Sequence, residues 1–238
     1  LAEQIATLDL LSGGRVDAGV GKGYRINEFD GFCVSTEEAD ERFEECLEVM
    51  TRAWTSDTPW SHQGTYWQFN EVVVEPPSAQ KPHAPLWMGA GSPRSIKQVA
   101  DRGYNMLLGQ FDSLETISEE VALFKSEVES RGRAYDPMEV AVARSINIVD
   151  SASEYEQAIQ TLMAGRRRTQ ALARRPDFQD TFEAAEDGTI YGTPDEVSAQ
   201  LQALHDVGVE YILLNTPGGL PTLRRFAQEV MPGFSREP

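Results

Sequence analysis

Short apolar runs alternate with amphipathic helical patterns along most of this 238-residue chain. Within each run the apolar residues are nearly continuous, which is typical of a strand covered by helices on both faces. Strands and helices in alternation predict an α/β fold built on a parallel sheet. The five runs lie near Val16, Leu86, Met106, Ala141 and Ile212.

Helix signals occupy the segments between these runs. Ser92 and Gly103 are typical of the N-cap and the C-terminal end of one helix. Thr193 and Glu196 have capping-box spacing at the start of another. The polar residues 176–189 have no pattern that predicts an element. Apolar periodicity predicts helices over residues 1–11, 36–54, 92–103, 114–131, 153–175, 193–208 and 220–230.

Residues 24–85 interrupt the alternation. The segment 24–35 is typical of a loop, and Ser35 and Glu38 have capping-box spacing ahead of the helix over 36–54. Residues 55–85 are rich in Pro, Trp and His, so we expect a long excursion with one hairpin within Thr65–Val74.

The strand count bears on the architecture. A (β/α)₈ barrel needs eight strands in typically about 250 residues, and a helix is already in progress at Leu1. The count favours a TIM (β/α)₈ barrel that is incomplete at the N-terminus, with about five of eight βα units present in a single domain over residues 1–238. A complete five-stranded doubly wound domain is the alternative.

Charge and cysteine content narrow the class of protein. The net charge of −17 argues against nucleic acid, because each phosphate contact would need a local cation against an unfavourable overall field. No apolar run approaches the roughly 18 residues of a membrane span, so no membrane partner is expected. Cys33 and Cys46 lack CxxC spacing and are typical of thiols in a reducing compartment. We therefore expect a cytoplasmic protein.

The strongest candidate for ligand binding follows the apolar run at residues 85–90, where Gly-Ala-Gly-Ser-Pro-Arg-Ser leads into a helix. Ligands of parallel α/β folds bind at the carboxyl ends of the strands. Free N–H groups and the positive dipole end of a helix start favour an anion. Ser92, Ser95 and Arg94 would add hydroxyls and a charge, so the pattern predicts phosphate binding. A plain tight turn capped by Ser92 is the alternative.

A second glycine-rich strand end is Gly19-Val-Gly-Lys-Gly-Tyr24. Flexible backbone and the charge of Lys22 meet there, which also suits a phosphate. The spacing is not that of a P-loop, and the predicted loop that follows is unlike a dinucleotide fingerprint. Close packing of the glycine backbone is the alternative.

Other chemistries have little support. His62, His83 and His205 do not have metal-ligand spacing, so no metal site is expected. No serine has the G-x-S-x-G context of a hydrolase nucleophile. The sequence identifies no catalytic acid or base.

Several segments, in this order, resemble the bacterial luciferase-like family of flavin-dependent oxidoreductases and monooxygenases. No single segment is diagnostic, but five in register are specific, and together they span nearly the whole chain. The segments are Leu8–Tyr24, Arg42–Met50 with Trp54, Gly64–Trp67, Pro82–Ser92, and Tyr191–Val197 with Gly208–Tyr211.

The resemblance implies a luciferase-like barrel that binds FMN, or the related deazaflavin coenzyme, at its C-terminal mouth. Members of the family place the cofactor phosphate on the loop and helix start after the fifth strand, and the end of the fourth strand borders the same site. The matching residues are Gly89, Gly91, Ser92 and Ser95 for the phosphate, and Gly21, Lys22 and Tyr24 at the border.

The resemblance also implies an activity. Reduced FMN and O₂ would oxidise a small organic substrate, with a flavin reductase as the partner that supplies reduced flavin, and a homo-oligomer is expected. Hydride transfer with deazaflavin, a non-catalytic flavin-binding barrel, and a sugar-phosphate lyase or isomerase barrel that uses the Ser92 helix are the alternatives. About 80 to 100 further residues, often with a catalytic histidine, are expected before Leu1.

Overall fold

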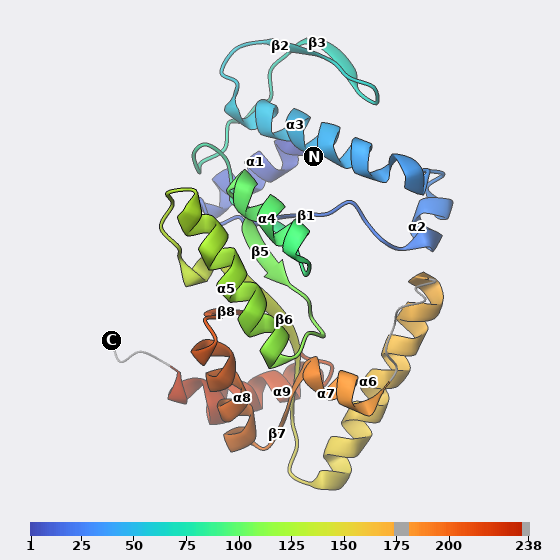
Figure 1. Ribbon diagram of the computed structural model, residues 1–238, viewed down its shortest axis with the longest axis vertical. Helices are drawn as coiled ribbons and strands as arrows, with labels where there is room; N and C mark the ends of the chain where they lie inside the picture. Colours follow the sequence, from blue (N-terminus) through green and yellow to red (C-terminus); the bar gives the residue numbers. More distant parts are fainter. Residues whose placement is uncertain (174–180, 235–238) are drawn as a thin grey trace. The chain divides into compact units, whose positions relative to one another are not determined.

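The computed structural model describes residues 1–173 and 181–234. The chain divides into two compact units, Leu1–Met88 and Gly89–Pro238. Both units contain helices and parallel strands, which confirms the predicted α/β class (Figure 1), and the first also contains an antiparallel hairpin.

The first unit contains the first two predicted strands, and these pair in parallel, with Ala18 opposite Leu86 and Val20 opposite Met88. The first strand is three residues long and begins later than residue 15, where the apolar pattern starts. The elements of this unit are α1 (Ala2–Ser12), β1 (Ala18–Val20), α2 (Ile26–Gly31), α3 (Ala39–Thr55), β2 (Trp60–Gln63), β3 (Gln68–Val72) and β4 (Leu86–Gly89), with a 3₁₀ turn at Thr36–Glu38.

Buried polar contacts hold the long segments of this unit together. α1 packs against α3, and the buried Trp54 of α3 donates its indole N–H to the Ala2 carbonyl at 3.0 Å. Asp9 of α1 is fully buried and accepts hydrogen bonds from the backbone N–H and the side-chain amide of Gln80, both at 2.8 Å. These bonds attach the proline-rich tail of the excursion to α1.

The excursion contains the predicted hairpin, but at an earlier position. β2 and β3 are antiparallel and span residues 60–72 instead of lying within Thr65–Val74. The turn between them wraps around the Glu45 carboxylate of α3, which accepts the backbone N–H groups of Thr65, Tyr66 and Trp67 at 2.9–3.2 Å. A carboxylate from another element thus decides where this hairpin turns, which the hairpin's own sequence does not reveal.

Two predictions near α3 are wrong. The segment 24–35, expected to be a loop, contains the short helix α2. Ser35 caps a 3₁₀ turn by accepting the Glu37 N–H at 3.2 Å, so the expected capping box with Glu38 does not form. Glu38 instead pairs with Arg42 one turn further on, at 2.8 Å.

The second unit contains the other three predicted strands and one more. The long strand β6 pairs in parallel with β5, β7 and β8. β7 begins at the end of the segment to which the sequence pattern assigns no element. The elements are α4 (Pro93–Arg102), β5 (Asn105–Leu108), α5 (Leu114–Ser130), β6 (Val140–Ile148), α6 (Ala152–Ala173), α7 (Phe182–Asp187), β7 (Thr189–Gly192), α8 (Pro194–Asp206), β8 (Tyr211–Asn215) and α9 (Gly219–Arg225).

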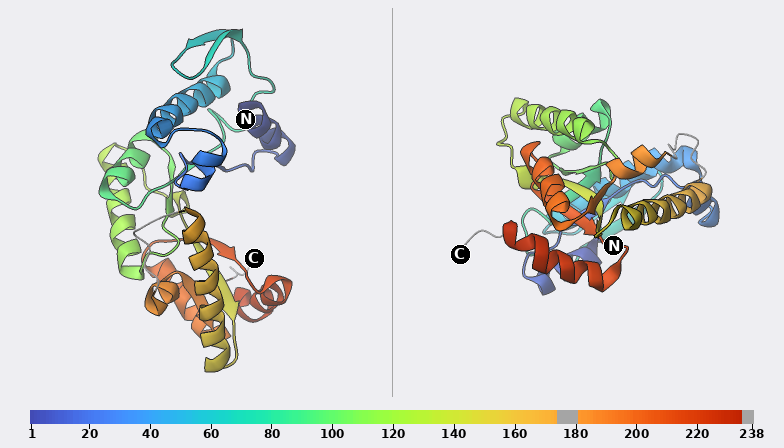
Figure 2. Two further views of the ribbon diagram at one scale, coloured as in Figure 1. Left: turned by 90° about the vertical axis from the view of Figure 1, so that its right-hand side faces the viewer. Right: turned by 90° about the horizontal axis from the view of Figure 1, so that it is seen from below.

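The core of this unit lies between two helices and the sheet. α4 and α5 pack side by side and both contact β5 (Figure 2). Because apolar residues recur every three or four positions on each helix, one face of each is buried. The fully buried side chains of this layer include Ile96, Val99, Met106, Ile117 and Phe124.

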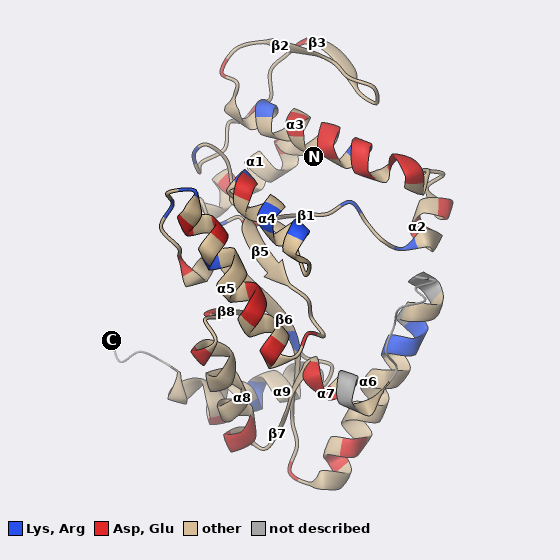
Figure 3. Ribbon diagram, viewed as in Figure 1, with Lys and Arg blue, Asp and Glu red and all other residues tan. Residues whose placement is uncertain are grey.

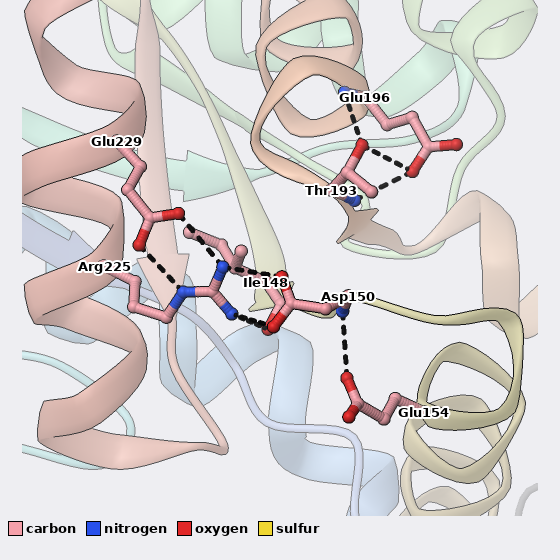
Figure 4. Close-up of polar contacts among 7 residues, drawn as sticks. All are labelled: Ile148, Asp150, Glu154, Thr193, Glu196, Arg225 and Glu229. Atoms are coloured by element: carbon pink, nitrogen blue, oxygen red, sulfur yellow. Dashed lines mark hydrogen bonds and ion pairs between the residues drawn. The ribbon is translucent and has the colours of Figure 1, made fainter.

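The start of α8 and the end of the helical C-terminal region can be compared with the sequence predictions. Thr193 and Glu196 form the expected capping box at the start of α8 (Figure 4). α9 continues into a π-helical turn at Phe226–Val230. The predicted end of α6, at residue 175, lies outside the described residues. Over the part of the chain that the structure describes, no helix combines the length and the apolar character needed to cross a bilayer.

Candidate functional site

The helix start after β4 is organised by two serines. Ser92 Oγ accepts the Ser95 N–H at 3.2 Å, and Ser95 Oγ accepts the Ser92 N–H at 3.0 Å, which completes a capping box. The Gly91 N–H also reaches Ser95 Oγ, at 3.3 Å. Pro93 occupies the first helical position, where its missing N–H costs nothing. Backbone N–H groups and two hydroxyls therefore converge at one helix N-terminus.

The chain's own packing does not require glycine in this turn. Neither Gly89 nor Gly91 has a positive φ. A Cβ on Gly89 would meet only the Leu107 carbonyl oxygen, at 4.0 Å, and a Cβ on Gly91 would meet Glu120 Oε1 at 3.5 Å. Both are ordinary van der Waals distances, so a tight turn alone does not explain these glycines. Because these glycines lack side chains, a ligand could contact the backbone of the turn directly.

Basic residues lie near the start of α4, over its first turns (Figure 3). They are Arg94, which is exposed, and Lys97, whose ammonium is 3.5 Å from Glu127 of α5. A positive dipole end with cations beside it favours an anion.

The second predicted group lies in the loop between β1 and α2. Gly21 has open space where a side chain would project, so close packing is not the reason for this glycine. Lys22 is exposed and forms an ion pair with Asp40 of α3 at 2.5 Å. Tyr24 is also exposed, with the Arg25 guanidinium 5.6 Å from its ring centroid. This group belongs to the first unit, and the group at residues 89–95 belongs to the second.

A second loop, after β5, is fixed by a buried arginine. Arg144 of β6 donates to the Gly109 carbonyl at 3.1 Å and to the Asp112 carbonyl at 2.7 Å. The Asp112 carboxylate folds back over Gly109 and occupies the position of a Cβ there, so a side chain at residue 109 would clash with it. These contacts hold the Asp112 carboxylate near the start of α5.

Glu120 of α5 is the least expected group of the site. It is 7% exposed, and its Oε2 has no hydrogen-bond partner among the described residues. Burial, together with the Asp112 carboxylate, raises the pKa of Glu120 to about 7. Glu120 is therefore poised to change charge near neutral pH.

The sequence interpretation missed Glu120 and Arg144, although each leaves a signal. Glu120 falls in the apolar periodicity of its helix, three residues after Ile117 and four before Phe124, where an apolar residue is expected. Arg144 directly follows four apolar residues, 140–143, at the start of a strand. A charge at a core position of either element marks a special environment. In the described residues, no cluster of three or more His, Cys, Asp or Glu side chains is arranged as metal ligands.

The chain is similar to two proteins that differ in cofactor. It is 26% identical over 255 residues to the FMNH₂-dependent dimethylsulfone monooxygenase of Pseudomonas putida, an alignment that covers 97% of this chain and 69% of that enzyme. It is 24% identical over 250 residues to the F420-dependent glucose-6-phosphate dehydrogenase of Amycolatopsis mediterranei, with 98% and 73% covered.

Two further comparisons concern length and fold. The chain is 28% identical over 176 residues to the protein y4vJ of Sinorhizobium fredii, covering 74% of this chain and only half of that protein's length. The crystal structure of the monooxygenase RslO1 from Streptomyces bottropensis superposes with a TM-score of 0.82 at 24% identity, over 98% of this chain and 73% of that one. That likeness shows a shared fold.

A family profile decides the relationship. The profile described as luciferase-like monooxygenase matches residues 1–211, which is most of the chain and includes both glycine-rich strand ends. The chain belongs to the luciferase-like monooxygenase family.

Proposed function

We propose that this chain is part of a flavin-dependent oxidoreductase and that the turn at Gly89–Ser95 holds the phosphate of FMN. The observation that carries the proposal is the combination of glycines that packing does not require with a serine-lined helix N-terminus. Backbone N–H groups, hydroxyls and nearby cations are the donor set that a phosphate prefers. The residues present therefore fit the group.

Each residue has a proposed role at the phosphate. Gly89 and Gly91 allow it to approach the backbone. Ser92 and Ser95 supply hydroxyl donors, because a serine O–H rotates to suit its acceptor. Ser95 Oγ accepts the Gly91 and Ser92 N–H groups, and a bound phosphate would take over these donors. Arg94 adds charge at the rim.

Gly21, Lys22 and Tyr24 of the first unit are proposed as cofactor-binding residues. Gly21 leaves the loop backbone bare. Lys22 forms an exposed ion pair, of a kind worth at most about 1 kcal/mol, so this contact would not prevent its ammonium from moving to an anion. Tyr24 presents an exposed ring that is suited to pack against an aromatic ligand.

Bound reduced flavin would supply the redox chemistry, the oxidation of a small organic substrate with O₂. The protein's part is to hold the phosphate, to orient the ring system and to exclude water. The similarity to the dimethylsulfone monooxygenase supports FMN as the cofactor. A flavin reductase is the proposed partner, because a similar protein, the trigonelline monooxygenase of Acinetobacter baylyi, is named as an oxygenase component. Self-association into a homo-oligomer and a cytoplasmic location stay proposals.

Hydride transfer with a deazaflavin is the second candidate, favoured by the F420-dependent relative. Both cofactors present a phosphate, so the turn at Gly89–Ser95 suits either. Binding titrations of the full-length protein with FMN, riboflavin and F420 distinguish them. FMN binding that is much tighter than riboflavin binding supports the phosphate site, and preferential F420 binding favours the second candidate.

Matched variants test the residues themselves. Ser95→Ala removes the acceptor of two loop N–H groups, and Glu196→Ala removes the corresponding third-position acceptor from the capping box of α8. Loss of such a hydrogen bond costs about 0.5–1.5 kcal/mol of stability in either case. Only Ser95→Ala is expected to weaken FMN binding, and equal FMN affinity of the two variants would contradict the proposed site.

A further inference from the structure

The Glu120 carboxyl group lies against the turn that we assign to the cofactor phosphate. Its Oε1 is 3.5 Å from the position that a Cβ on Gly91 would take. Its Oε2 is buried and has no hydrogen-bond partner within the described residues. With the side chain 7% exposed, water reaches this group poorly. If this carboxyl group were ionised, its negative charge would repel an anion bound at the turn.

The groups around Glu120 do not offset a negative charge on it. Asp112, from the loop after β5, is itself acidic and acts on Glu120 through its field. Two buried cations lie beside that loop: the Arg144 guanidinium of β6 donates to the Gly109 and Asp112 carbonyls, and the Arg166 guanidinium lies 4.0 Å from the centre of the Phe111 ring. The Arg144 guanidinium therefore binds the loop backbone and forms no ion pair with Glu120 among the described contacts.

Three charged side chains of α4, which packs against α5, have other partners or are exposed. Lys97 lies 3.5 Å from Glu127, two turns beyond Glu120. Asp101 lies 3.3 Å from Arg131 at the end of α5. Arg94 is exposed at the helix start. On α5 itself, Glu115, Glu119 and Lys125 are exposed and point away from the buried face.

We propose that Glu120 controls anion binding at residues 91–95: as a neutral acid it permits a phosphate to bind, and as a carboxylate it opposes binding. The inference rests on the proposed phosphate site. Two like charges in a partly buried site cannot both persist without strong repulsion. When a phosphate binds above neutral pH, Glu120 must therefore take up a proton from solvent. The affinity for a phosphorylated cofactor then falls as the pH rises.

FMN and riboflavin titrations of the full-length protein at pH 6.5 and 8.5 test the proposal. Since one linked proton changes affinity by up to tenfold per pH unit above the pKa, and pH 8.5 lies about 1.5 units above the Glu120 pKa of about 7, we expect FMN affinity to fall about 25-fold across this range. Riboflavin, which has no phosphate, is expected to bind equally at both pH values. Glu120→Gln should remove the fall, and Glu119→Gln, an exposed neighbour on the same helix, should retain it.

The outcomes are distinguishable. FMN affinity with the same pH dependence in wild type and Glu120→Gln would overturn the role of Glu120 and leave the phosphate site standing. Absence of FMN binding at both pH values would overturn the cofactor assignment and this inference with it. If Glu120→Gln does not fold, calorimetry of the wild type at pH 8 in buffers of different ionisation enthalpy measures the proton directly. Uptake of about one proton per FMN is expected, and no uptake overturns the inference.

Discussion

Arg225 holds the carboxylate of Asp150 at both oxygens, with Nη1 to Oδ2 at 3.0 Å and Nη2 to Oδ1 at 2.9 Å (Figure 4). The same guanidinium binds Glu229 in the π-helical turn and the Ile148 carbonyl at the end of β6. A bidentate arginine pair fixes orientation as well as distance. It joins the last helix of the chain to the carboxyl end of the central strand.

Asp150→Asn is expected to lower the Tm at pH 7. The bonds from Arg225 hold the pKa of Asp150 below its usual range. A carboxyl whose pKa is lowered by folding contributes stability above its unfolded pKa of about 3.9, and this stability is lost as the pH falls through the folded pKa. The Tm difference from wild type should therefore narrow below pH 4. Glu129→Gln, at an exposed site on α5, is the control and should change the Tm little. A difference that is constant with pH would contradict the ionic contribution.

Gly64→Ala is expected to destabilise the first unit. A Cβ at this position would coincide with the Glu45 carboxylate that anchors the hairpin turn. Displacing that carboxylate leaves backbone N–H groups unsatisfied, at a cost of roughly 1–3 kcal/mol. Urea unfolding measures the loss. Gly31→Ala, where a side chain meets open space at the end of α2, should change the free energy of unfolding by less than about 0.5 kcal/mol. Equal effects of the two substitutions would exclude the clash.

Local signals in the sequence were sufficient for several elements. Ser92 and Gly103 mark both ends of α4, and Thr193 with Glu196 marks the start of α8, because a cap depends on residues three or four positions apart. The family resemblance drew on the same glycine-rich strand ends. It named the residues of the helix start, although not their contacts.

Elements that depend on distant partners were not predictable in the same way. β7 is stabilised as a strand by pairing with β6, where Ile190 lies opposite Ile146. Its four residues are too few to form a pattern that predicts this pairing. The hairpin turn is located by Glu45, some twenty positions earlier in the chain. Glu120 has an unusual pKa only because folding buries it beside Asp112. Burial and long-range pairing, rather than local propensity, decide these features.

Gly91→Ala separates binding from folding. Because a Cβ on residue 91 meets only Glu120 Oε1 at van der Waals distance and φ is not positive, the free energy of unfolding should stay within about 1 kcal/mol of wild type. The methyl group would nevertheless occupy the space through which a phosphate approaches the backbone. We expect FMN affinity to fall at least about tenfold, or 1.4 kcal/mol. Gly165→Ala within α6 is the control and should leave FMN affinity unchanged. If Gly91→Ala binds FMN as tightly as the wild type, the proposed role of Gly91 in phosphate binding is wrong.

Glu120→Gln is expected to make the protein more stable in alkaline solution. Folding raises the pKa of this carboxyl from 4.5 to about 7, so the neutral acid is favoured in the native state. The stability present below pH 4.5 is lost as the pH rises towards 7, to an extent on the order of 3 kcal/mol. The amide cannot ionise, so the variant should gain stability relative to wild type between pH 5 and pH 8. Urea unfolding at several pH values, without any ligand, measures the gain. Glu119→Gln, exposed on the same helix, should follow the wild type. Parallel pH profiles for wild type and Glu120→Gln would show that Glu120 ionises normally in the folded protein.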